Sequence, residues 1–86
     1  MSIENFEIGM LARSKAGHDK GHVYVIYEVD ETYVYLVDGK IRTLSNPKKK
    51  KRKHVQIICE MQEIRGMDDV GIKRRLKVFD KETGRN

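Results

Sequence analysis

The chain has 86 residues, of which 38% are hydrophobic and 36% charged, and its formal net charge is +5. This length predicts one domain with a small core, because a chain of this size buries only about 60% of its unfolded surface. A single cysteine excludes an internal disulfide framework and a multi-thiolate metal site. Because no stretch approaches about 18 apolar residues and no basic apolar leader is present, we expect a cytoplasmic protein with no membrane partner.

The first 62 residues are predicted to form β-structure. Alternating or β-branched segments predict five short strands, at residues 8–13, 22–29, 33–37, 40–44 and 54–59. Asp38-Gly39 predicts a tight hairpin turn, because both central residues of such a turn need a positive φ. Five strands joined mostly by short turns predict an all-β fold, a small closed or half-closed barrel, since closure removes exposed sheet edges.

Two segments between these strands are predicted to be loops. The first loop (residues 14–21) contains two glycines and almost no bulky side chain. The second follows Pro47, which interrupts a strand because proline lacks a backbone N–H. This second segment contains the basic run at residues 48–53 and is predicted to be extended.

The last segment, residues 63–86, is predicted to be a helix and tail appended to the barrel. Asp68 is a suitable N-cap. Three apolar side chains recur at helical spacing and share one face, namely Ile72, Leu76 and Phe79. We expect this face to dock on the barrel or on a partner. The opposite face is either solvated or a second candidate phosphate-binding patch, formed by Arg74, Lys77 and Lys81.

The positive charge is concentrated in the basic run. Residues 45–54 contain six basic and no acidic side chains, whereas residues 1–44 contain five basic and seven acidic ones. A concentrated patch of this kind indicates a polyanionic partner, with an affinity that falls with salt for each phosphate contacted. The alternatives are a disordered solubilising loop and a nuclear-import signal.

The first loop has a composition suited to phosphate binding. Gly17 and Gly21 allow backbone N–H groups to approach a phosphate, and charge is supplied by Arg13, Lys15 and Lys20. The alternative is a turn that needs glycine for its geometry alone. Asp19 is expected to have a structural role, through a salt bridge to Lys15 or Lys20 or by capping the turn.

The tyrosines at positions 24, 27, 33 and 35 are expected mainly in the core. The alternative is stacking on unpaired bases, for which Tyr24 is the first candidate. Catalytic patterns are missing: His18 and His22 lack a third zinc ligand, and Cys59 is expected to be a small buried hydrophobe. We therefore expect no enzyme activity, cofactor, metal or small-molecule substrate.

Three blocks of the sequence together resemble a KOW motif: GMLARSKAGHDKGHVYVI at residues 9–26, YLVDGK at 35–40 and PKKKKRKHV at 47–55. The chain is similar in this respect to small bacterial KOW-domain RNA-binding proteins, themselves similar to KOW-type large-subunit ribosomal proteins of archaea and eukaryotes. The resemblance spans about residues 8–58. It implies an SH3-like barrel that binds structured RNA through the first loop and nearby strand ends.

The combined expectation is a ribosome-associated protein of translation that contacts ribosomal RNA phosphates through two basic loops, with ribosomal proteins as further partners. Phosphate contacts fix position and carry no sequence information. The alternatives are a protein-interaction KOW module docking on a polymerase or ribosomal protein, and a nonspecific polyanion or DNA binder. The expected RNA-binding residues are Arg13, Ser14, Lys15, Gly17, His18, Lys20, Gly21, Lys48, Lys49, Lys50, Lys51, Arg52, Lys53 and His54.

Overall fold

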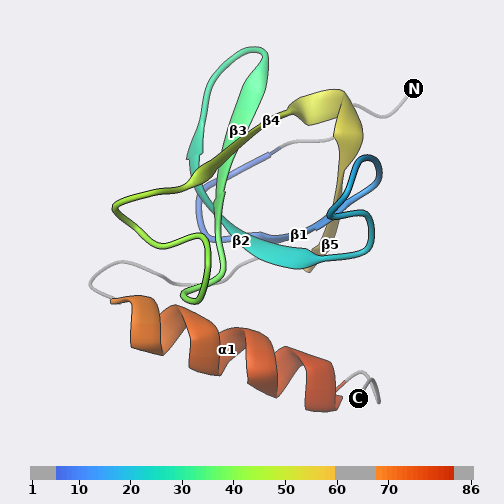
Figure 1. Cartoon of the computed structure of the whole chain (residues 1–86). Helices are drawn as coiled ribbons and strands as arrows, with labels where there is room; N and C mark the ends of the chain where they lie inside the picture. Colours follow the sequence, from blue (N-terminus) through green and yellow to red (C-terminus); the bar gives the residue numbers. More distant parts are fainter. Residues whose placement is uncertain (1–5, 60–67, 83–86) are drawn as a thin grey trace.

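The computed structural model describes residues 6–59 and 68–82. Within these residues, five antiparallel strands form one sheet in the order β4-β3-β2-β1-β5, and one α-helix packs beside it (Figure 1). The elements are β1 (Leu11–Ser14), β2 (Val23–Val29), β3 (Tyr33–Val37), β4 (Lys48–Lys51), the 3₁₀-helix η1 (Arg52–His54), β5 (Val55–Cys59) and α1 (Asp69–Glu82). The predicted mainly-β class with a short C-terminal helix is confirmed.

The fourth strand differs from its prediction. Residues 40–44 form no strand, and the predicted extended loop at 48–53 is wrong because Lys48–Lys51 is strand β4, paired with β3. Asp38-Gly39 is also not a two-residue hairpin turn, since ten residues separate β3 from β4. The Asp38 carboxylate accepts hydrogen bonds from the amides of Lys40 (2.9 Å) and Arg42 (3.0 Å), so these amides are taken up locally instead of pairing with a strand.

The sheet is strongly bent and encloses an apolar core on its inner face. Val55 of β5 belongs to the same buried cluster as Val34 of β3, although two strands separate β5 from β3 in the sheet order. Irregularities in register, which favour bending, lie between Leu11 and Ala12 and between Ile26 and Glu28. The buried inner side chains are Met10, Ala12, Tyr24, Ile26, Val34, Leu36 and Val55.

The outer face of the sheet is covered in part by α1, as Figure 1 shows. Ile72 and Phe79 lie on one helical face and pack on apolar side chains of β1, β2 and β3, namely Leu11, Val25 and Val37. Of the two predicted docking surfaces for this face, the barrel or a partner, the structure shows the sheet, and Leu76 is partly buried against the same cluster. Arg74 and Lys77 are exposed, while the side chain of Lys81 lies outside the described residues.

The start of α1 is fixed by two aspartates. Asp68 is the predicted N-cap, and its Oδ1 accepts a hydrogen bond from the amide of Gly71 (2.9 Å). Asp69 Oδ1 accepts one from the amide of Leu44 (2.8 Å), which joins the β3–β4 loop to the helix. Gly39 has φ +77°, and a Cβ there would overlap the Asp69 carbonyl oxygen. The close approach of this loop to α1 therefore requires glycine.

Candidate nucleic-acid interface

The first loop is held together by its own backbone. The amide of Gly21 donates to Ser14 O (2.8 Å), and the amide of Lys20 donates to Gly17 O (3.2 Å). Gly17 and Gly21 both have positive φ, at +87° and +91°. No atom lies within 4 Å of a Cβ built on Gly21, so its glycine is required by the backbone conformation and not by a close neighbour.

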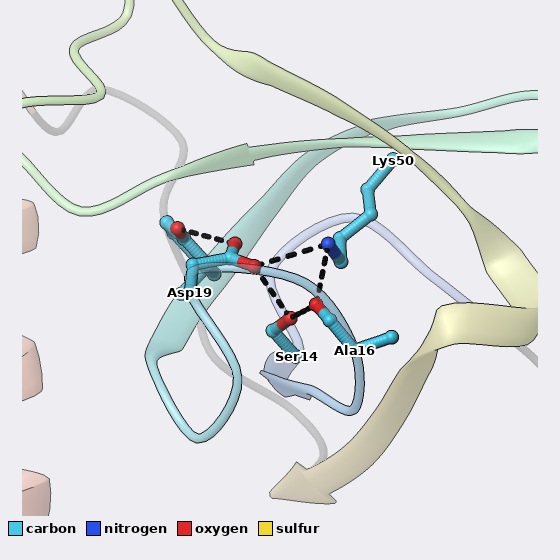
Figure 2. A network of polar contacts seen from close by, with 5 residues as sticks. Ser14, Ala16, Asp19 and Lys50 are labelled. Atoms are coloured by element: carbon cyan, nitrogen blue, oxygen red, sulfur yellow. Dashed lines mark hydrogen bonds and ion pairs between the residues drawn. The ribbon is translucent and has the colours of Figure 1, made fainter.

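Asp19 is the centre of a polar network that ties the first loop to β4 (Figure 2). Its Oδ1 accepts from Lys50 Nζ (3.0 Å), and its Oδ2 accepts from the Tyr24 hydroxyl (2.8 Å). The Ser14 hydroxyl lies 2.9 Å from Asp19 Oδ1 and 3.0 Å from the Ala16 carbonyl, between which its single proton is shared. Asp19 has the expected structural role, but its ion-pair partner is Lys50 and not Lys15 or Lys20.

The network changes the acidity of its members. Partial burial raises the pKa of Asp19, but hydrogen bonds from Tyr24, Lys50 and Ser14 lower it more, so that the pKa falls from 3.8 to about 2. Burial, followed by the bond to Asp19, raises the pKa of the Tyr24 hydroxyl above its ordinary value. The network thus holds Asp19 ionised and Tyr24 protonated over the neutral pH range.

This lowered pKa predicts a loss of stability in acid. A folded-state pKa below the unfolded one stabilises the fold at pH values above 3.8, and this contribution disappears as the pH falls towards about 2. After a discount for solvent screening we expect it to be about 1–2 kcal/mol. Urea unfolding across this pH range should show a steeper loss for the wild type than for Asp19→Asn. Asp30 and Asp38 also have lowered pKa values, so the test is the difference in acid sensitivity between the wild type and Asp19→Asn. An equal loss of unfolding free energy with falling pH in the two proteins would contradict the lowered pKa of Asp19.

Strand β4 divides the basic run between the two faces of the sheet. Directly paired residues share a face, so Lys48 and Lys50, opposite Leu36 and Val34, lie on the inner side. Lys50 is largely buried and also donates to the Ala16 carbonyl (3.0 Å). Lys49 and Lys51 are exposed on the outer side, opposite tyrosines. The lysines of β4 therefore do not form a single phosphate-binding surface.

Arg52 fastens η1 to the turn between β2 and β3. Its Nη1 donates to the carbonyls of Asp30 (3.1 Å) and Glu31 (3.3 Å), and its backbone amide donates to Thr32 O (2.9 Å). The guanidinium carbon lies 4.9 Å from the centre of the Phe6 ring. Like Lys50, Arg52 already has structural partners in the free protein.

The first loop and η1 meet at one end of the sheet. The amide of Lys15 donates to the carbonyl of His54 (2.8 Å), next to the paired residues Ser14 and Val55. We define the loop–η1 surface by its exposed side chains, which are Lys15, His18, Lys20 and Lys53. Of the other expected RNA-binding residues near it, Arg13 and His54 are half-buried and Ser14 is buried.

A second polar pair, between a histidine and an aspartate, lies beside the first loop. His22 Nε2 is 2.9 Å from Asp38 Oδ2. Burial raises the pKa of Asp38, but hydrogen bonds from the amides of Lys40 and Arg42 and from His22 lower it below its ordinary value. Neither this pair nor the Lys50–Asp19 pair had a local signal in the sequence, because their partners are 16 and 31 residues apart.

The described parts of the chain contain no group of three or more His, Cys, Asp or Glu side chains arranged to hold a metal ion. Nor do they contain a helix with the length and apolarity needed to cross a membrane. No protein-family model matches the chain, and a search of curated proteins finds no match. The resemblance to a KOW motif therefore rests on the three sequence blocks alone and stays a prediction.

Proposed function

We propose that this protein binds structured RNA by placing the loop–η1 surface on phosphates. The observation that carries the proposal is the junction of Lys15 with His54, which brings the exposed Lys15, Lys20 and Lys53 to one end of the sheet. Three ammonium groups on a rigid support attract a backbone that carries one charge per phosphate. The net charge of +5 favours the same class of partner.

The rigidity of the first loop supports recognition by shape. The Lys50–Asp19 pair fixes the loop against β4, so little conformational entropy remains to be lost when RNA binds. Double-stranded RNA is read mostly through its shape and phosphates, because side chains cannot enter its deep major groove. A fixed spacing of cations therefore selects among folded RNAs without reading bases.

Ribosomal RNA is the RNA that the KOW resemblance favours. The first block of that resemblance supplies the loop with Lys15 and Lys20, and the third block supplies Lys53. We accordingly propose that the protein is ribosome-associated, with an SH3-like barrel as its finer fold.

Sedimentation of a cell extract through a density gradient tests the ribosomal part of this proposal. We expect the protein to sediment with ribosomal subunits. Recovery of the protein only at the top of the gradient would contradict its association with ribosomes.

Charge removal at the loop–η1 surface tests RNA binding directly. We expect Lys15→Gln, Lys20→Gln and Lys53→Gln together to weaken binding to a folded RNA hairpin by at least about tenfold at low salt. The slope of log K against log salt should become less negative by about 2–3, because three phosphate contacts are lost. Fluorescence anisotropy titrations at several salt concentrations measure both quantities.

The matched control removes three exposed charges from α1, by Lys73→Gln, Arg74→Gln and Lys77→Gln. Glutamine removes the charge but keeps an unbranched polar side chain with a similar helix propensity. We expect this variant to bind the hairpin as the wild type does. A loss confined to the α1 variant would place the interface on the helix, whereas binding without salt dependence would favour a protein-interaction module. Equal affinity for duplex DNA would favour a nonspecific polyanion binder.

A further inference from the structure

The outer face of the sheet carries a row of polar and aromatic side chains that the loop–η1 surface does not use. Glu28 of β2 is paired with Tyr35 of β3, and Tyr35 is paired with Lys49 of β4. Directly paired residues lie on one face, so these three side chains form a row across three strands. Tyr33 and Lys51 form the next pair on the same face. We call these five residues the tyrosine surface.

The helix leaves this surface open. α1 packs on Leu11, Val25 and Val37, whereas Tyr33 begins β3 at the end remote from the helix (Figure 1). Tyr33 and Tyr35 are partly exposed, and Lys49 and Lys51 are exposed. Tyr24, by contrast, is 3% exposed and belongs to the inner core, so it is not a stacking residue.

The tyrosines are held in place before any ligand arrives. Asp30 Oδ1 accepts from the amides of Tyr33 (2.6 Å) and Thr32 (2.9 Å), and its Oδ2 accepts from the Tyr35 hydroxyl (3.2 Å). Lys49 Nζ lies 4.3 Å from the centre of the Tyr33 ring. Among the described residues, the Tyr33 ring is therefore partly exposed and lies against the ammonium of an exposed lysine.

We propose that the tyrosine surface binds an unpaired segment of the RNA, with bases stacked on Tyr33 and Tyr35 and phosphates along β4. This inference rests on the proposed function, RNA binding, and extends it to single-stranded RNA. Stacking on an aromatic ring is stronger than an exposed cation–π contact, so a base displaces the ammonium of Lys49. Lys49 and Lys51 then pair with phosphates. Glu28 on the opposite side repels phosphates and directs the backbone over β4.

The test uses a single-stranded RNA oligonucleotide that contains one 2-aminopurine, whose fluorescence is quenched by stacking. We expect Tyr33→Leu with Tyr35→Leu to abolish most of the quenching and to weaken single-strand binding by about tenfold or more. Leucine keeps the apolar contacts of each position and removes the ring. Tyr27→Leu is the matched control, because Tyr27 is 38% exposed but does not belong to the tyrosine surface. It lies at the register irregularity between Ile26 and Glu28.

A second variant does not disturb the partly buried tyrosines. Lys49→Gln with Lys51→Gln changes only exposed side chains and should reduce the salt slope for the single strand by about 1.4, from two lost contacts. Unchanged single-strand affinity and quenching in both double variants would overturn the inference. If the Lys15, Lys20 and Lys53 variant still loses hairpin binding, the proposed function survives that outcome. If the Lys15, Lys20 and Lys53 variant keeps hairpin binding and only the tyrosine variant loses single-strand binding, the loop–η1 surface is not an RNA site, and RNA binding is assigned to the tyrosine surface alone.

Discussion

Replacing Lys50 with methionine should lower the free energy of unfolding by about 2–3 kcal/mol. Lys50 and Asp19 have side chains that are 11% and 16% exposed, with 3.0 Å between their charged atoms. Removal of the ammonium leaves a largely buried carboxylate whose remaining side-chain partners, among the residues that the structure describes, are the hydroxyls of Tyr24 and Ser14. Residual exposure places the expected loss below the range of about 3–5 kcal/mol that is typical of fully buried pairs. Chemical denaturation at neutral pH measures it.

Lys51→Met is the matched control for this change. Lys51 is the next residue of β4, is exposed, and undergoes the same loss of charge, so we expect a change within about 0.5 kcal/mol. Adding Asp19→Asn to Lys50→Met should restore part of the stability, because the uncompensated buried charge is then removed. Similar destabilisation by Lys50→Met and Lys51→Met would show that the ion pair of Lys50 with Asp19 does not stabilise the fold.

Local strand signals explain why the sequence predicted β2 and β3 well and β4 poorly. The β-branched and aromatic residues of β2 and β3 carry their strand signal locally, and both strands lie within a residue of their predicted ranges. Lys48–Lys51 has no apolar residue and low β-propensity. It becomes a strand through pairing with β3 and through the ion pair of Lys50 with an aspartate 31 residues away.

The false strand at residues 40–44 has the converse cause. Ile41, Thr43 and Leu44 give an apolar pattern that resembles a short strand, but Ile41 is 78% exposed and Leu44 packs on the helix cluster. The Asp38 carboxylate accepts hydrogen bonds from the amides of Lys40 and Arg42, which would pair with a neighbouring strand if this segment were part of the sheet. Nothing in the local pattern shows that a helix 25 residues further along receives this segment, through Asp69.

The charged residues of the candidate site could be found in the sequence, but the face of the sheet on which each one lies could not. The first loop and the basic run both carry the charges from which phosphate binding was inferred. The alternation along β4 then separates Lys50, used inside the fold, from Lys49 and Lys51 outside it. A period of two is visible in a sequence only when residue types alternate, and four consecutive lysines conceal it.

Gly39→Ala should be among the most destabilising single substitutions of an exposed or half-buried residue in this chain. An alanine there adopts φ +77° at a cost of about 1–2 kcal/mol. Its Cβ would also overlap the Asp69 carbonyl oxygen and lie 2.8 Å from the Lys73 amide nitrogen, both of which are backbone atoms of α1. The helix must therefore shift away from the β3–β4 loop, which loosens the packing of Ile72 on the sheet. We expect a total loss of about 3–4 kcal/mol.

Gly21→Ala separates the two causes. Gly21 has φ +91°, yet no atom lies within 4 Å of a Cβ built there, so this variant has the conformational cost alone, about 1–2 kcal/mol. Hydrogen exchange should show faster opening of α1 amides in Gly39→Ala and unchanged opening in Gly21→Ala, because only the former displaces the helix. Equal losses of stability and equal exchange of α1 in the two variants would mean that the β3–β4 loop does not press against the helix. The outer face of the sheet would then owe its cover to Ile72 and Phe79 alone.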